Sequence, residues 1–329
     1  MRRASSTFSF AEEWLAGELT PSDLLGRIAH AGAPDGIEVI GHQLWRAFPE
    51  LDHAEIRSFR ALLEELELEP AALGIYVDLF RRSDRRLTHA EALEELGAQV
   101  EMAGRLSFPV ARIPSGVPLE VLEGIAPRAE RAGVVVATEV QGDQRPDDPA
   151  VAPLLELLER LSSPGLGLVL DFSVAMRRVP STFVSAVLEA GFPADALEDV
   201  ISRWERGART GEILRMLERS EAPQSALDLA RSGFVRFGRQ DPEAWRPYVP
   251  SIVHVHAKVW ELDSLGDDPA TRDAELIAVL REGGYDRFVC SEWGGGAWLE
   301  ADEVDPFALA RQHHAHLARL IEQTSPVLA

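Results

Sequence analysis

Short apolar runs recur along the whole chain, and a longer segment with helical periodicity follows most of them. The runs that we expect to form strands are 7–10, 37–41, 73–78, 110–114, 134–140, 166–171, 252–257 and 288–292. Between them, segments such as 54–66, 90–103 and 118–131 carry apolar residues at helical spacing. This alternation is typical of parallel β/α units. Eight such units in series predict a single domain over residues 1–329, a closed (β/α)8 barrel.

A doubly wound open sheet is the alternative architecture for the same alternation. Such a sheet usually carries a glycine-rich phosphate loop, but Gly294-Gly295-Gly296 follows the last run and matches neither the dinucleotide nor the P-loop pattern. No linker rich in glycine, serine or proline divides the 329 residues, and 46% of them are hydrophobic, which is ample for one large core. The barrel is therefore the favoured fold class.

The connection between the sixth and seventh runs is much longer than its neighbours. Asp171 and His256 are 85 positions apart, whereas Glu139 and Asp171 are 32 apart. The surplus, 174–250, contains helical patterns, and long connections after a barrel strand usually lie over the end of the barrel where ligands bind. We expect a helical excursion between strands 6 and 7 that acts as a lid, a substrate wall or a docking surface. A purely structural decoration is the alternative.

Composition narrows the class of protein. The formal net charge of -21 disfavours nucleic acid as a partner, because an acidic surface repels phosphate. With Cys290 as its only cysteine, the chain forms no intrachain disulfide and no multi-cysteine metal site. The sequence shows neither an apolar signal stretch after Met1 nor a run of about 20 apolar residues. We therefore expect a cytoplasmic protein with no membrane span.

Charged residues close several of the predicted strands. Glu139, Asp171 and Glu292 end the fifth, sixth and eighth runs, and His256 lies near the end of the seventh. In a parallel barrel these ends meet at one mouth, where burying three carboxylates is costly unless a cation compensates their charge. Three carboxylates with one neutral imidazole suit Mn²⁺ first, with Mg²⁺, Co²⁺ or Zn²⁺ as alternatives. A local salt bridge or a helix cap is the alternative for each carboxylate taken alone.

Other polar and aromatic residues are expected at the same mouth. His254 shares a face with His256 but lies deeper, where packing is the alternative role. Lys258, one step further out, is a candidate electrophile or proton donor, with a solvent-facing lysine as the alternative. Arg112 closes the fourth run and is a candidate for binding a substrate oxygen. Trp260 and Trp293 are candidate stacking surfaces for a sugar ring or an aromatic aglycone, although rim aromatics are also common in cores.

For the lone cysteine and for a cluster of histidines near the end of the chain, we expect structural roles and not catalytic ones. Cys290 precedes Ser291 on the last run and is expected to be buried packing rather than a nucleophile. The histidines His313, His314 and His316 fall on the last helical segment, where we expect a solvated face.

The order of these residues along a barrel resembles that of the sugar phosphate isomerase/epimerase superfamily, the xylose-isomerase-like TIM barrels. Over nearly its full length the chain is also similar to the metal-binding large subunit of bacterial C-glycoside deglycosidases. The residues that carry this resemblance include 36–40 with Phe48-Pro49, 126–130, Glu139-Val140, 252–258, Glu261 with Asp263, and 281–286 before Ser291-Glu292.

The resemblance implies a reaction. In the superfamily, a bound divalent metal polarises a ketone or aldehyde while a carboxylate or histidine removes the α-proton. In the deglycosidases, the substrate is a 3-oxo-C-glycoside, the C–C bond is cleaved by elimination, and a small β-sandwich subunit is attached. The alternatives are a sugar or keto-sugar isomerase or epimerase, and a non-catalytic metal- or sugar-binding partner subunit. An oligomer is expected, and a phosphodiester-cleaving barrel is disfavoured by the acidic charge.

One departure from the family pattern bears on catalysis. The resemblance implies a catalytic histidine two residues after the metal-binding Glu139, and Gln141 occupies that position. Glutamine takes up no proton near neutral pH, so it cannot act as a general acid or base. The candidate replacements are His42 after the second run, Asp78 at the end of the third, and Lys258.

Overall fold

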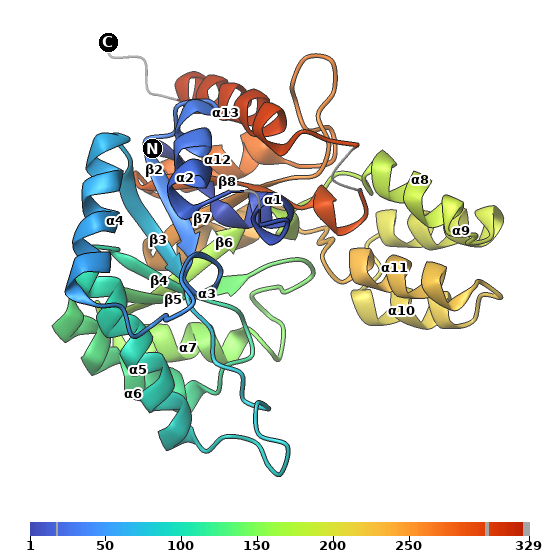
Figure 1. Cartoon of the computed structure of the whole chain (residues 1–329). Coiled ribbons are helices and arrows are strands. Elements are labelled where there is room, and N and C mark those ends of the chain that lie inside the picture. Colours follow the sequence, from blue (N-terminus) through green and yellow to red (C-terminus); the bar gives the residue numbers. More distant parts are fainter. Residues whose placement is uncertain (18, 300–302, 325–329) are drawn as a thin grey trace.

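The strands close into a barrel. The computed structural model describes residues 1–17, 19–299 and 303–324, and within them eight parallel strands lie in chain order, with β1 pairing with β8 (Figure 1). The strands are β1 Arg2–Ser6, β2 Gly36–Ile40, β3 Glu69–Gly74, β4 Val110–Ile113, β5 Val135–Val140, β6 Leu166–Asp171, β7 Ile252–Val259 and β8 Phe288–Trp293. The predicted (β/α)8 barrel is confirmed.

Helices surround the barrel. They are α1 Ala11–Leu15, α2 Pro21–His30, α3 Gly41–Leu44, α4 His53–Glu65, α5 His89–Arg105, α6 Leu119–Ala132, α7 Ala152–Leu161, α12 Asp273–Glu282 and α13 Pro306–Gln323. Capping boxes fix the first turns of α2, α4 and α5; in α5, Thr88 and Glu91 satisfy each other's backbone N–H groups. Within the described residues, no helix combines the length and apolar character needed to cross a membrane.

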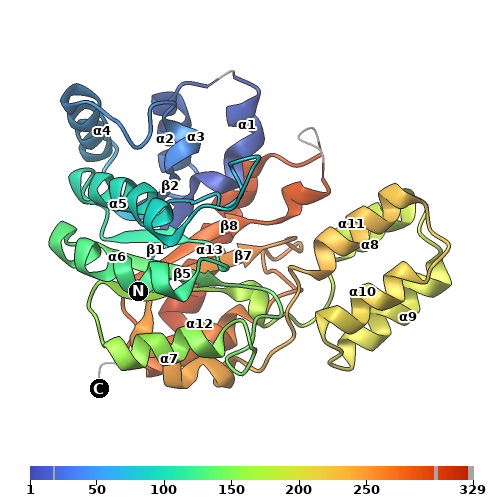
Figure 2. The ribbon, with the colours of Figure 1, turned by 90° about the horizontal axis from the view of Figure 1, so that it is seen from below.

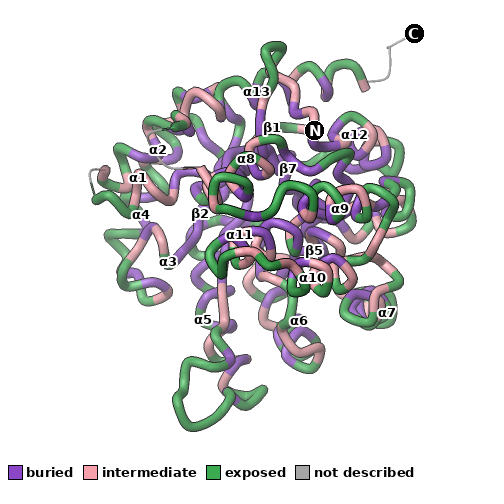
Figure 3. Tube along the Cα trace, turned by 90° about the vertical axis from the view of Figure 1, so that its right-hand side faces the viewer, coloured by how far each residue is buried: buried purple, intermediate pink, exposed green. Residues whose placement is uncertain are grey.

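Two predicted strand boundaries were wrong. The first strand is β1, and residues 7–10, predicted as strand, form a 3-10 helix instead. The buried end of β1 consists of Ala4, Ser5 and Ser6, so it carries no apolar run by which the sequence could reveal it. The third strand ends at Gly74, which leaves Asp78 in the exposed loop that projects from the barrel before α5 (Figure 3).

The histidines of α13 are buried, so the prediction of a solvated face was wrong. The reason is that α13 packs against β1 and β8, whose serines offer hydrogen-bond partners. Ser5 Oγ lies 2.7 Å from His314 Nε2, and Ser291 Oγ lies 2.8 Å from His313 Nδ1. His316 Nδ1 lies 2.8 Å from an oxygen of Asp267 in the loop after β7.

Between β6 and β7 the chain leaves the barrel and forms a helical lobe. Its helices are α8 Ser181–Glu189, α9 Ala194–Glu205, α10 Thr210–Glu218 and α11 Gln224–Phe234, and they stand to one side of the barrel (Figures 1 and 2). The lobe has its own apolar core, which Trp260 and Ala270 enter from the loop after β7. These helices lie within 174–250, where the sequence indicated a helical excursion. Its role as a lid stays a prediction.

Candidate metal centre and pocket

The carboxyl ends of four strands bring together the four predicted metal ligands. Glu139 lies on β5, Asp171 ends β6, His256 lies on β7 and Glu292 on β8, and all four side chains are buried. His256 Nδ1 lies 2.8 Å from an oxygen of Glu139, 3.1 Å from one of Glu292 and 3.8 Å from one of Asp171. Residues up to 153 positions apart in sequence therefore lie in one buried cluster. Within it, Glu139, Asp171 and His256 form one group that could hold an ion, and Glu38, His256 and Glu292 form another.

His256 is oriented by a carboxylate that the sequence analysis did not single out. Glu38, fully buried on β2, lies 2.7 Å from His256 Nε2 and 2.8 Å from His254 Nε2. Arg112 of β4 also donates to Glu38, at 3.3 Å. A hydrogen on Nε2 of His256 is therefore held by Glu38, which leaves Nδ1 facing the three other carboxylates. Metal-binding histidines commonly have this second partner, which fixes the ring and raises its basicity.

The donor set fits a divalent cation. One oxygen of Asp171 and one of Glu292 are buried and accept no hydrogen bond from the described residues. Neighbouring ligands of an ion bound at about 2.1 Å in octahedral geometry lie about 3 Å apart, close to the distances around His256 Nδ1. In the protein alone, these oxygens face only the Lys258 ammonium, 3.1 Å from Asp171, and His256 Nδ1, 3.1 Å from Glu292. An ion would satisfy both oxygens while taking the place of the proton on Nδ1.

The charges around this point support the same assignment. Burial opposes protonation of His256, but the carboxylates of Glu38, Glu292 and Glu139 outweigh it and raise its pKa well above the usual range. Burial alone would raise the pKa of Glu139, yet His256 and Arg112 lower it to about 2. The pKa of Asp171 is raised, chiefly by burial and against the influence of Lys258. The carboxylates of the cluster therefore outnumber its cationic side chains, and the cluster carries an excess of negative charge.

Lys258 supplies part of the missing positive charge. Its Nζ lies 3.1 Å from Asp171 and donates to Glu292, and the side chain is buried. Burial would lower the pKa of Lys258, but Asp171, Glu292 and Glu139 raise it far above the usual value, so the ammonium stays protonated. Lys258 is therefore a buried, charged hydrogen-bond donor at the edge of the cluster and not a solvent-facing lysine; its role as an electrophile or proton donor stays a prediction.

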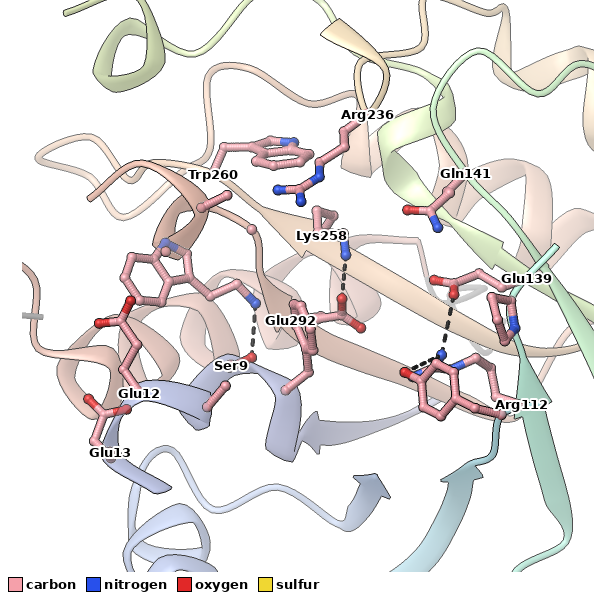
Figure 4. A pocket seen from close by; sticks show the side chains of 18 residues that line it. Ser9, Glu12, Glu13, Arg112, Glu139, Gln141, Arg236, Lys258, Trp260 and Glu292 are labelled. Atoms are coloured by element: carbon pink, nitrogen blue, oxygen red, sulfur yellow. Dashed lines mark hydrogen bonds and ion pairs between the residues drawn. The ribbon is translucent and has the colours of Figure 1, made fainter. Parts of the chain in front are cut away.

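A pocket of about 420 Å³ opens onto the cluster (Figure 4). This volume is within the range of small-molecule sites. Its wall includes five of the residues predicted to act on substrate: Arg112, Gln141, Lys258, Trp260 and Trp293. Further lining residues that the sequence analysis did not name are Phe8, Glu12, Glu13, Tyr76 and Arg236. Glu12 and Glu13 line one side of the pocket, whereas Arg236 and Trp260 line the other (Figure 4).

Two predicted catalytic residues lie elsewhere. His42, on α3, is exposed and packs its ring edge-on against Phe48, with ring centroids 5.0 Å apart. Asp78 is exposed and accepts a hydrogen bond from the backbone of Phe80 at 2.9 Å, as in a turn. Neither lines the pocket. Of the candidate replacements for the missing histidine, Lys258 alone lies in the pocket wall.

Comparisons with known proteins agree with the architecture. A family model described as a xylose isomerase-like TIM barrel matches residues 25–320. A C-glycoside deglycosidase alpha subunit of Arthrobacter globiformis is 31% identical over 94% of this chain and 87% of its own. A 3'-dehydrocarminate deglycosidase alpha subunit of a Microbacterium species is 27% identical over 97% and 95%. The structure of a D-psicose 3-epimerase superposes with a TM-score of 0.58 at 14% identity, covering 98% and 99% of the two chains.

Proposed function

The chain belongs to the xylose isomerase-like TIM barrel family, and from that premise we propose that it is a divalent-metal-dependent enzyme that removes a proton next to the carbonyl of a keto-sugar. Deglycosidase subunits about 30% identical over most of the chain support an enzyme acting on glycosides. One observation carries the proposal: donor atoms from β5, β6, β7 and β8 lie close together in a buried cluster, in which His256 Nδ1 faces three carboxylates.

Glu139, Asp171, His256 and Glu292 would hold the ion, for which Mn²⁺ is the first expectation. A bound ion in such a site supplies electrostatic stabilisation of the negative charge that develops on a carbonyl oxygen. Glu38 holds the ring of His256 in place, and Arg112 neutralises Glu38. The protein thereby fixes the orientation of the His256 ring before any substrate arrives, and a bound ion would displace the proton from Nδ1.

The reaction we favour is the elimination of a 3-oxo-C-glycoside. The proton on C2, next to the C3 carbonyl, passes to a carboxylate of the pocket wall, for which Glu12 and Glu13 are the candidates, and a C1–C2 double bond forms. The bond between C1 and the aglycone carbon breaks, its electron pair leaves with the aglycone, and that carbon takes up a proton. The apolar side chains of Phe8, Trp260 and Trp293 in the pocket wall suit an aromatic leaving group.

Lys258 is our candidate for the group that delivers this proton. Its ammonium is held at the pocket wall by Asp171 and Glu292, so a proton on Nζ is available to the leaving carbon. Gln141 also faces the pocket (Figure 4), where its amide can bind a sugar hydroxyl but cannot exchange a proton. The two residues therefore have different roles in this proposal.

An isomerase or epimerase is the second candidate function. The same first step, removal of a proton next to a carbonyl, leads to isomerisation when the proton returns to the neighbouring carbon or to the other face. The deglycosidase relatives favour elimination. A barrel that binds metal or sugar without turnover is the third candidate, because Gln141 replaces the expected histidine.

We also propose that a second subunit completes the enzyme in the cell. Relatives over most of the chain are named alpha subunits. The small β-sandwich partner that the resemblance implies, the oligomeric state and a cytoplasmic location stay predictions.

Proton exchange into the substrate tests the proposed function. Metal-loaded protein in D₂O should replace the C2 hydrogen of a 3-oxo-C-glucoside with deuterium or release the aglycone, as NMR would show. Asp171→Asn should abolish both signals, because it removes a charged oxygen from the cluster. Glu64→Gln, at an exposed position of α4, is the matched control and should leave them unchanged. Metal-loaded wild-type protein that produces neither signal would contradict the proposal and favour the binding module.

A further inference from the structure

Arg236 brings a positive charge into the pocket from the helical lobe. It follows α11, is half-buried, and lines the pocket beside Trp260 (Figure 4). No hydrogen bond or ion pair joins its guanidinium to any residue that the structure describes. Burial lowers the pKa of Arg236, an effect that nearby Glu292 only partly offsets, so the side chain is held in an unfavourable position without a partner.

The other cations of the pocket wall are already neutralised. Arg112 lies 3.3 Å from Glu38 and 3.6 Å from Glu139. Lys258 pairs with Asp171 and Glu292. These carboxylates surround the candidate metal centre, and within the described residues none of them lies within ion-pair distance of Arg236. The acidic residues Glu12 and Glu13 line the other side of the pocket (Figure 4).

The backbone that carries Arg236 is tightly fixed. Gly238 donates to the carbonyl of Ser173 at 2.8 Å, and a Cβ on Gly238 would lie 2.0 Å from the carbonyl oxygen of Gly142. Gly142 has φ +57°, and a Cβ there would lie 2.6 Å from the carbonyl oxygen of Val235. The segment that carries Arg236 is thus packed against the residue that follows Gln141.

A neighbouring aromatic side chain fixes the same segment from the other side. Phe237 meets Trp260 edge-on, with ring centroids 5.2 Å apart, and its carbonyl accepts a hydrogen bond from Trp204 at 3.1 Å. A charged side chain that is placed on so rigid a support, in a pocket, and without a protein partner has the features of a preorganised ligand contact.

We propose that Arg236 binds a carboxylate on the aromatic leaving group of the substrate. Guanidinium groups recognise carboxylates through two parallel hydrogen bonds, and a partly desolvated pair is stronger than one in water. The same pocket offers the exposed side chain of Phe8 as an apolar surface for the ring that bears the carboxylate. The inference rests on the proposed function for the assignment of the leaving group, but binding by Arg236 can be measured without turnover.

Calorimetric binding of two matched probes tests this inference. The probes are 4-(C-glucosyl)benzoate and the corresponding benzamide, both without the 3-oxo group, so neither undergoes the proposed elimination. Metal-loaded wild-type protein should bind the benzoate about 10-fold or more tightly than the benzamide at low salt. Arg236→Gln should reduce this preference to less than about 2-fold, and Arg236→Lys should retain part of it.

Two controls show whether the preference for the benzoate comes from a direct contact with Arg236, and not from the overall charge of the lobe or from misfolding of the variant. Arg215→Gln removes an exposed positive charge from α10 of the same lobe and should leave the preference unchanged. Equal melting temperatures for wild type and Arg236→Gln would exclude unfolding. The inference is overturned if wild type shows no preference, if it binds neither probe, if Arg236→Gln keeps the full preference, or if glucose 6-phosphate binds more tightly than the benzoate. Absence of turnover with normal probe binding would instead count against the proposed function.

Discussion

At the scale of single residues, Glu38 connects the interior of the barrel to the candidate metal centre. It is fully buried and yet accepts from His254, His256 and Arg112. Burial opposes its ionisation, but the charge of His256 and the hydrogen bonds from both histidines lower the pKa of Glu38 well below its usual range. A carboxylate that stays ionised in the barrel interior thus holds the imidazole of His256 with Nδ1 toward the other three carboxylates.

Substitution of Glu38 by glutamine should therefore weaken metal binding without removing a ligand. We expect the dissociation constant for Mn²⁺ to rise by about 10- to 100-fold, because the amide is a poorer acceptor for His256 Nε2–H. Isothermal titration of chelator-stripped protein measures this effect, with Glu64→Gln as the control for a lost surface charge. An unchanged dissociation constant in Glu38→Gln would show that Glu38 has only a packing role.

Gln141 offers a test in the opposite direction, since it occupies the position where the family resemblance implies a catalytic histidine. Gln141→His should raise kcat for 3-oxo-C-glycoside cleavage by about 10²-fold or more, because a general base typically contributes that much. The added activity should rise with pH around the pKa of a histidine, whereas Gln141→Asn should show no gain. A variant no faster than wild type would mean that another residue already performs the proton transfer.

The sequence could reveal part of this site. Glu139, Asp171 and Glu292 end apolar runs, and this position marks them as candidate functional residues in a parallel barrel. Glu38 lies within a strand, and its partners are 74 residues away on β4 and 218 residues away on β7, so its role appears only when the barrel closes. Arg236 lies in the long excursion, where no periodicity shows which residue faces the pocket.

At the scale of elements, β1 could not be predicted from the sequence, because its buried residues are small and mostly polar. β1 is recognisable only by its pairing with β2 and β8, which aligns Ser5 with Ile37 and with Ser291. Those two serines are also the partners of the buried histidines of α13, His314 and His313. The serines of β1 and β8 therefore contact the buried histidines of α13. Neither the strand β1 nor the burial of these histidines could be predicted from its own local sequence, because each depends on this contact.

Helix α13 should make the protein sensitive to acid. Burial lowers the pKa of His314 to about 3, and Arg3 adds to the effect, whereas an unfolded histidine titrates near 6.5. Between pH 6.5 and pH 3, His314 therefore binds a proton in the unfolded chain but not in the folded chain. Its contribution to the free energy of unfolding is fully present above pH 6.5 and is lost as the pH falls towards 3. The loss is up to about 5 kcal/mol from this residue.

Denaturant unfolding at several pH values measures this contribution. His314→Gln keeps a hydrogen-bonding side chain near Ser5 but cannot be protonated, so its stability should fall less steeply between pH 6.5 and pH 4. His53→Gln, at an exposed position of α4, should retain the wild-type slope. Equal slopes for wild type and His314→Gln would contradict the assignment.

At the scale of the whole molecule, the barrel and the lobe share one aromatic residue. Trp260 follows β7, lines the pocket, and also belongs to the core of the lobe, where it stacks on Trp298 at 5.4 Å. The alternation of apolar runs and helices was enough to predict the barrel, because each β/α unit repeats the same pattern. The position of the lobe beside the pocket depends on contacts that no local pattern encodes.

The metal content of the protein tests the central claim most directly. Protein stripped with a chelator and reloaded with Mn²⁺ should retain one ion per chain after desalting, as measured by elemental analysis. Asp171→Asn and Glu139→Gln should retain far less while melting as folded proteins, because each replaces a charged ligand by a neutral one. Wild-type protein without a stoichiometric ion, or ligand variants that bind as much metal as wild type, would contradict the account.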